Sequence, residues 1–245
     1  MSAELTVEDI RNIAAKLESV LHLTAPLIGI QFSDVQPEGL AQFDEPLAPI
    51  AENGRTGRVP AGCVFWMKAS EKSFTTVAQD HGNCSVGSFT HGLLSMSEIA
   101  SNSDVSALLE SGWVDEKAVA SIPFVGRKYN YISYGPLSEG AFHPDVVLMR
   151  LNARQMMVVS DALGISIEGK PQCHIVAIAK DQNRVAASVG CALSRARTGM
   201  QPSQMTCAIP AAIFEEVVAA IEKASHIDTE VAKYAAVDAR RFSYN

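Results

Sequence analysis

The sequence lacks the motifs that mark the commonest enzyme classes. No P-loop, GxGxxG, HExxH or GxSxG pattern occurs in its 245 residues. Nucleotide-binding, zinc-protease and serine-hydrolase assignments therefore have no motif to support them. The five cysteines form no CxxC pair, which argues against a thioredoxin-like site and a zinc ribbon. Any chemistry has to come from residues that are dispersed along the chain.

Long apolar runs and clusters of basic residues are also missing. No stretch approaches the roughly 18 apolar residues of a membrane span, and the acidic N-terminus, MSAELTVEDI, does not resemble a signal peptide. The formal net charge of −7 argues against nucleic acid as a partner. We therefore expect a cytoplasmic protein with no membrane and no nucleic-acid partner, whose cysteines are reduced thiols, ligands or nucleophiles.

The hydrophobic residues, 47% of the chain, are sufficient for a buried core without disulfides. Apolar spacing predicts an amphipathic helix over 7–22, with Thr6 as its N-cap, and a helix over 153–163. Continuous apolar runs predict buried strands over 25–32 and 145–151.

Further along the chain, HIVAIAK (174–180) and RVAASV (184–189) are predicted to be strands, joined as a hairpin. Pro210 is predicted to open a strong helix. Together these elements predict an α/β or α+β fold, with a mixed β-sheet flanked by helices in a single domain, 1–245.

A weak internal repeat relates two parts of the chain. VPAGC, ending at Cys63, resembles KPQC, ending at Cys173, and in each case an apolar segment, a polar turn, a strand and a second cysteine follow. Cys84 follows Cys63 by 21 residues, and Cys191 follows Cys173 by 18. We interpret the chain as two related halves, 25–125 and 126–225. A pseudo-twofold axis between them would bring the four thiols toward one place.

Cys84 and Cys191 each stand between a predicted strand and a predicted helix. Unpaired N–H groups at a helix start lower the pKa of a cysteine, which favours a nucleophile or a ligand. Gly190, directly before Cys191, allows a close approach of the backbone. The alternative is that these cysteines are small, buried apolar residues, a common state of free cysteine.

Four cysteines in two matched pairs are the ligand set of an iron–sulfur cluster. The predicted metal ligands are Cys63, Cys84, Cys173 and Cys191, and Cys207 is treated as structural. A zinc ion would also accept four cysteines, but zinc ligands are usually more closely spaced in sequence. Arg195, four residues after Cys191, is predicted to share its helical face and to contact an anionic ligand. Arg197 is more simply a surface residue.

His81 and His91 flank Cys84 and give two further possibilities. Either imidazole could bind a haem or a metal, and His81 could act as the general base for a Cys84 nucleophile. A lone histidine is, however, more often a hydrogen-bonded structural residue. Tyr129, Tyr131 and Tyr134 could line a pocket, but strand packing explains them equally well.

Three segments together resemble the domain-of-unknown-function family 169, an uncharacterised family of archaea and bacteria. They are SFTTVAQDHGNCSVGSFTHGL, GAFHPDVVLMRLNARQMMVVSDAL and VAASVGCALSRARTGM. The resemblance covers roughly residues 10–225 and implies that Cys84 and Cys191 occupy the family's cysteine positions, together with Gly87 and Arg195. It implies no established activity.

The leading interpretation is a metallocofactor-binding protein that holds an iron–sulfur cluster, or a haem, and acts on a small molecule or a redox partner. The first alternative is a cofactor-free thiol enzyme that uses Cys84 and His81. The second is a small-molecule binding or assembly module with structural cysteines. Whether the chain forms a homo-oligomer is left open.

Overall fold

The computed structural model of the chain describes residues 5–44, 63–82, 84–100, 102–165 and 167–242. Within them, a seven-stranded sheet has the order β2-β3-β1-β4-β7-β6-β5. Neighbouring strands are antiparallel except for the parallel pair β5–β6, so the sheet is mixed and the fold is α/β, as expected. The strands are β1 (Ile28–Ser33), β2 (Phe74–Thr76), β3 (Tyr131–Pro136), β4 (Val146–Asn152), β5 (Ile167–Glu168), β6 (Ala186–Ser188) and β7 (Gln204–Pro210).

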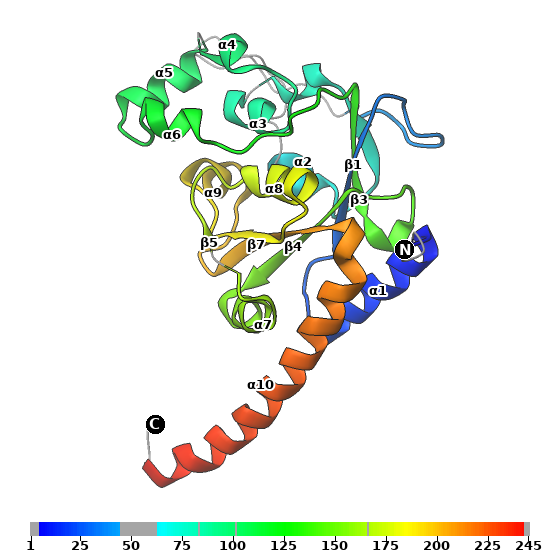
Figure 1. The fold of residues 1–245 in the computed structure, drawn as a ribbon, viewed down its shortest axis with the longest axis vertical. Coiled ribbons are helices and arrows are strands. Elements are labelled where there is room, and N and C mark those ends of the chain that lie inside the picture. Colours follow the sequence, from blue (N-terminus) through cyan, green and yellow to red (C-terminus); the bar gives the residue numbers. More distant parts are fainter. Residues whose placement is uncertain (1–4, 45–62, 83, 101, 166, 243–245) are drawn as a thin grey trace.

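Helices cover both faces of the sheet (Figure 1). The helices α1 (Val7–Leu21), α7 (Ala153–Leu163) and α10 (Phe214–Phe242) pack on one face. On the other face, α2 (Cys63–Lys68) and α8 (His174–Gln182) pack against the sheet. The remaining helices are α3 (Ser85–Thr90), α4 (Met96–Ile99), α5 (Ser103–Glu110), α6 (Glu116–Ala120) and α9 (Ala192–Thr198), with short 3-10 turns η1 (Ala78–His81), η2 (Leu137–Glu139) and η3 (Ala211–Ile213).

Strand β4 lies near the middle of the sheet and contributes to both cores. Val147 and Met149 join the core formed with α1, α7 and α10, whereas Val146 and Leu148 join the core formed with α2 and α8. Successive side chains of a strand point to opposite faces. A continuous apolar run, rather than an alternating one, is therefore what a strand covered on both faces requires.

The N-terminal helix begins as the sequence predicts. The Thr6 hydroxyl accepts a hydrogen bond from the Asp9 N–H, and the Asp9 carboxylate accepts one from the Thr6 N–H. This reciprocal capping box satisfies N–H groups that have no partner inside the helix. The prediction of a helix over 7–22 with Thr6 as N-cap is confirmed.

The described elements follow a similar order twice along the chain. The first set is β1, α2, β2, α3, β3 and η2, and the second contains β4, α8, β6, α9, β7 and η3. The sets meet at the antiparallel β1–β4 pair, on either side of which the strands continue in the same order. The predicted halves, 25–125 and 126–225, divide the chain differently, because they assign β3 to the second half.

The helices of the two sets pack across one another. Helix α2 contacts α9, and α3 contacts α8. Each contact therefore joins a helix of the first set to a helix of the second. This crossed packing brings the beginnings of helices from both sets into one region above the sheet.

Two sequence predictions were wrong in the second set. Residues 174–180 form the helix α8 rather than a strand, and residues 175–179 are all buried. A helix buried on every side loses the 3.6-residue alternation, so a short apolar run does not distinguish it from a buried strand. The hairpin of 174–180 with 184–189 is therefore absent from the described structure, although β6 lies within the second segment.

Strand β7 was not anticipated. It pairs with β4 over its whole length and includes Cys207, whereas the sequence patterns predicted only a helix opened by Pro210 in this region. Pro210 ends β7, and the long helix begins after it, at Phe214. Proline has no N–H to donate to a neighbouring strand, so it is tolerated at the end of a strand. Pro210 was therefore recognised as a boundary between elements, but the strand before it was not predicted.

No helix in the described ranges combines the length and apolar character that a membrane crossing requires.

The double coverage of β4 leads to a test of the fold. Leu148 is 0% exposed in the core with α2 and α8, so Leu148→Ala should lower the free energy of unfolding by about 2–5 kcal/mol through lost burial and a residual cavity. Val35 is 73% exposed, and Val35→Ala should change it by less than about 0.5 kcal/mol. Urea unfolding followed by circular dichroism measures both. Equal urea midpoints for Leu148→Ala and Val35→Ala would contradict the placement of β4 between the two cores.

Candidate functional site

Four cysteines line one small cavity, here called the thiol cavity. Its volume is about 20 Å³, which is about the space of one water molecule. The cysteines are Cys63, Cys84, Cys173 and Cys191, and the other lining residues include Gly87, Gln172, Ser194 and Arg197. The sequence analysis singled out the same four cysteines, and the structure brings them together around one space.

Each of these cysteines stands at the beginning of a helix. Cys63 is the first residue of α2, whereas Cys84, Cys173 and Cys191 are the N-caps of α3, α8 and α9. The crossed packing of these helices places their beginnings around the cavity. All four cysteines are free, and three of them are partly exposed, so the cavity lies close to the protein surface.

Cys84 and Cys191 have matching local geometry. The Cys84 sulfur accepts a hydrogen bond from the Gly87 N–H at 3.4 Å, and the Cys191 sulfur accepts one from the Ser194 N–H, also at 3.4 Å. In both cases a backbone N–H at the helix start donates to sulfur across three residues. Such N–H donors would remain available to hydrogen-bond a thiolate ligand.

The thiols influence one another electrostatically. Burial, followed by the neighbouring Cys84 and Cys191, raises the pKa of Cys63 to about 12, while Arg197 acts in the opposite sense. Burial is also the largest cause that holds the pKa of Cys173 well above its ordinary value, followed by Cys84. Cys63 and Cys173 are therefore neutral thiols at pH 7 unless a cation is present, because deprotonation would place a negative charge in a buried site.

Tyr134, on β3, provides an unsatisfied polar group beside these thiols. Its side chain is 0% exposed, and its hydroxyl has no hydrogen-bond partner in the described structure. Burial, followed by the nearby Cys173 and Cys63, raises the pKa of Tyr134, so the hydroxyl remains protonated and able to donate. A buried hydroxyl without a partner costs free energy. Tyr134 is near Cys173 and Cys63 but is not among the residues that line the thiol cavity.

The sulfurs surround the cavity rather than a single point. Among the described residues, no three or more His, Cys, Asp or Glu side chains are arranged so that they could hold a metal ion. The four thiols, as the structure places them, are therefore not arranged as the ligands of a single metal ion.

The other predicted cofactor residues differ in their relation to the cavity. Gly87 lines it. Gly190 lies beside it with φ +89°, and an added Cβ would lie 3.1 Å from the Met200 sulfur and 3.2 Å from the Gln172 side-chain oxygen. A side chain at Gly190 would therefore be strained and would press on a residue that lines the cavity.

Arg195 and Arg197 have the reverse of the expected positions. The Arg195 guanidinium donates to the carbonyls of Gln201 at 2.7 Å, Gln204 at 3.1 Å and Val189. It is not among the residues that line the thiol cavity, whereas Arg197 is. The position of Arg195 thus indicates that it fixes the loop around α9, and it gives no support to a cofactor-binding role. Arg195 was favoured because it follows Cys191 by four residues and would share its face of a regular helix. The thiol cavity does not lie along that face.

The two histidines near Cys84 are packed in the core. His81 Nε2 lies 2.9 Å from the Thr76 hydroxyl, and burial lowers the His81 pKa well below its ordinary value. His91 Nδ1 donates to the Gly87 carbonyl at 2.8 Å, and burial lowers the His91 pKa to about 4. Neither side chain lines the thiol cavity. These positions give no support to His81 as the base of a Cys84 nucleophile.

Cys207 is separated from the other cysteines by the sheet. It belongs to the core formed with α1, α7 and α10, on the face opposite α2 and α8, and burial raises its pKa to about 12. This buried position agrees with the structural role that the sequence suggested for Cys207.

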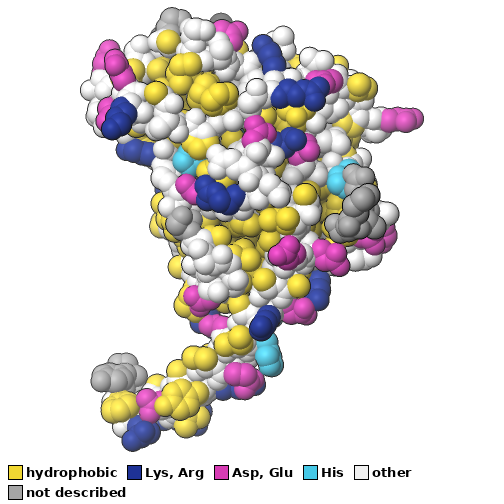
Figure 2. Space-filling view, in the orientation of Figure 1, with side chains coloured by type: hydrophobic (Ala, Val, Ile, Leu, Met, Phe, Trp, Pro, Cys, Tyr) yellow, Lys and Arg dark blue, Asp and Glu magenta, His cyan; other side chains and the backbone are white. Residues whose placement is uncertain are grey.

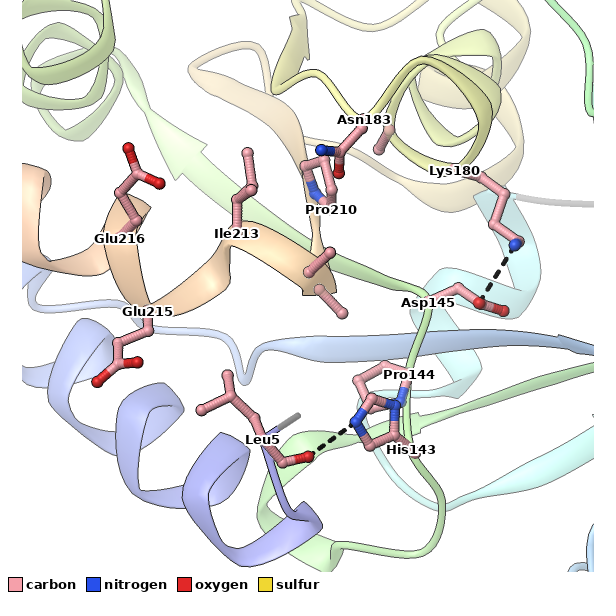
Figure 3. Close-up of a pocket in the computed structure, with 13 residues that line it drawn as sticks. Leu5, His143, Pro144, Asp145, Lys180, Asn183, Pro210, Ile213, Glu215 and Glu216 are labelled. Carbon is pink, nitrogen blue, oxygen red and sulfur yellow. Dashed lines mark hydrogen bonds and ion pairs between the residues drawn. The ribbon is translucent and has the colours of Figure 1, made fainter. Parts of the chain in front are cut away.

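A larger cavity, of about 570 Å³, lies near the C-terminal end of α8 (Figure 3). Within it, the Lys180 ammonium lies 3.2 Å from one carboxylate oxygen of Asp145, and the other oxygen accepts a hydrogen bond from the Phe32 N–H. These charges already satisfy each other and connect α8 to the sheet. The cavity has room for a small molecule, but its central charged groups are engaged in holding the fold.

Comparisons with curated proteins and with solved structures give no match. One family model matches the chain, over residues 16–220, and it is described as uncharacterised ArCR. This match includes all four cysteines of the thiol cavity, and on its extent the chain belongs to the domain-of-unknown-function family 169 (DUF169).

Proposed function

We propose that the protein binds a metallocofactor in the cytoplasm, and that this cofactor is an iron–sulfur cluster held by the four cysteines of the thiol cavity. The observation that carries the proposal is their convergence, since cysteines from four separate helices line one cavity. Iron–sulfur clusters are held by four cysteine thiolates. The thiol cavity lies close to the protein surface, so a redox partner or a small molecule would reach the cluster there.

A cluster agrees with the spread of the sulfurs better than a single ion does. Four thiols placed around a space, without converging on a point, can each bind a different iron of a cluster. The free cavity of about 20 Å³ is smaller than a cluster, so loading requires the thiols to move apart. Cys191 is partly exposed, and outward rotation of its side chain is the least costly way to widen the site.

The surroundings of the cavity suit an anionic cluster. The N–H groups of Gly87 and Ser194 already donate to sulfur, Arg197 adds a positive charge at the lining, and the Tyr134 hydroxyl is free to donate. Hydrogen bonds to the sulfurs and nearby charge set the reduction potential of a cluster. These groups therefore offset the negative charge that four thiolates bring.

The alternatives have weaker support. Haem needs a cavity far larger than one water molecule, and neither His81 nor His91 faces the thiol cavity. A thiol enzyme needs a base within reach of Cys84, and the His81 ring instead packs 4.7 Å from the ring of Phe65 and bonds to Thr76.

Replacing the ligands provides the direct test. Protein loaded with iron and sulfide without oxygen should show a visible absorption band, and Cys84→Ser or Cys191→Ser should abolish or strongly weaken it, because a neutral hydroxyl replaces a thiolate ligand. Cys207→Ser is the matched control and should keep the band, since Cys207 lies across the sheet. Circular dichroism establishes that each variant is folded. A band that survives all three substitutions, or that never forms in the wild type, would refute the proposal.

The raised thiol pKa values predict how the metal-free protein responds to pH. A thiol of the unfolded chain loses its proton near pH ~8.5, whereas Cys63 in the folded chain keeps it until about 12. Above pH ~8.5 the unfolded chain therefore binds fewer protons, and the free energy of unfolding should fall as the pH rises. Urea midpoints between neutral and alkaline pH measure this fall, and Cys63→Ser should lessen it. An identical pH dependence in the variant would show that Cys63 ionises normally.

Tyr134 should tune the cluster without holding it. In Tyr134→Phe the cluster should still load, because the ligands remain, but its reduction potential should become more negative, since a hydrogen bond that stabilises the more negative, reduced cluster is lost. Redox titration followed by electron paramagnetic resonance measures the change. Thr90→Val is a useful comparison, because the Thr90 hydroxyl is the hydrogen-bond partner of Cys173. An unchanged potential in Tyr134→Phe would mean that its hydroxyl does not contact the cluster.

A further inference from the structure

Gln172 brings an unpaired hydrogen-bond donor to the thiol cavity. Its side chain lines the cavity and is 3% exposed. The side-chain oxygen of Gln172 lies 3.5 Å from the Thr206 hydroxyl, but its amide nitrogen has no hydrogen-bond partner among the described residues. A buried donor without an acceptor costs free energy. An acceptor placed in the thiol cavity would remove that cost.

Arg197 adds a second unpaired donor, and this one is charged. Its side chain also lines the cavity and is partly exposed. Within the described ranges, the Arg197 guanidinium forms no hydrogen bond and no ion pair. It acts to lower the pKa of the Cys63 thiol, so its positive charge is felt inside the cavity.

No acidic side chain offsets these donors. The described residues that line the cavity include no Asp or Glu, and the sequence has none from Gln182 to Phe214, the stretch that contains α9. Acidic residues are otherwise abundant, since the chain has 27 Asp and Glu against 20 Lys and Arg. On the face shown in Figure 2 the two kinds are mixed. The electrostatics of the cavity therefore favour a ligand that is negatively charged and accepts hydrogen bonds.

We infer that the small molecule that meets the thiol cavity is an oxyanion, either a carboxylate or a phosphate, and that Arg197 and Gln172 bind it. The planar fork of a guanidinium fits two oxygens of such a group, and the Gln172 amide donates to an oxygen that enters the cavity. The free space of about 20 Å³ admits one group of that size. The rest of the ligand lies outside, on the exposed side of Arg197.

This inference deepens the proposed function and rests on it for what happens after binding, because it names the class of small molecule that reaches the cluster. A guanidinium carries five N–H donors, so Arg197 can face the cluster and the ligand together. Binding itself needs no cluster. It is therefore measured on the reduced, metal-free chain, in which the pKa values of Cys63 and Cys173 keep both thiols neutral.

Titration with sodium acetate and with sodium phosphate, followed by amide NMR at constant ionic strength, tests the site. At least one of the two anions should give saturable shifts at the Gly87 and Ser194 amides, which line the cavity, and the tighter one identifies the class. Arg197→Gln should weaken that binding by more than about tenfold, because a charge-assisted hydrogen bond is lost. Gln172→Leu should weaken it less. Arg154→Gln, which removes the same charge from α7 on the opposite face of the sheet, is the matched control and should bind as the wild type does.

Three results would overturn the inference. They are the absence of saturable shifts with either anion, equal shifts with sodium chloride, and unchanged binding in Arg197→Gln. The visible band of the loaded protein reports on the cluster separately. A cluster that loads in a chain that binds neither anion would refute this inference alone, whereas anion binding by a chain that never forms the band would refute the proposed cofactor and leave the oxyanion site standing.

Discussion

The crossed packing of α2 with α9 and of α3 with α8 is the constraint on which the thiol cavity depends. Each of these helices begins with, or is capped by, a cysteine, and none of the four elements could form the cavity alone. The sheet fixes the relation between them, because the two sets of elements meet at the β1–β4 pair. The cysteines of such a site are distant in sequence and close in space. The geometry of the site therefore depends on how tightly these helices pack against one another.

Burial gives the cavity its chemical character. It raises the pKa of Cys63 and Cys173, so these thiols remain neutral until a cation compensates their charge. Under the proposed function, binding of a metal would therefore release protons and couple cofactor binding to pH. The Tyr134 hydroxyl has no hydrogen-bond partner in the described structure. The low-dielectric surroundings that disfavour thiolates also make such an unpaired donor costly. Both features are expected of a site that is completed by a ligand.

Sequence patterns predicted the amphipathic helices and the apolar strands β1 and β4, but not every buried element. Helix α1 was predicted with its cap because amphipathic spacing and capping are local signals. Helix α8 and strand β7 were missed because complete burial removes the polar residues that reveal periodicity. The four cysteines were found through their matched local contexts. Arg197 was assigned to the surface, and strand packing explained Tyr134 equally well, because no local pattern records which side chain reaches across from another element.

Iron K-edge X-ray absorption of the anaerobically loaded protein tests the central claim most directly. An iron–sulfur cluster held by four cysteines predicts a first shell made only of sulfur, together with a short iron–iron distance that a single ion cannot give. The same spectrum of Cys207→Ser should be unchanged. Oxygen or nitrogen neighbours without an iron–iron contribution, or no iron retained at all, would contradict the account of the thiol cavity.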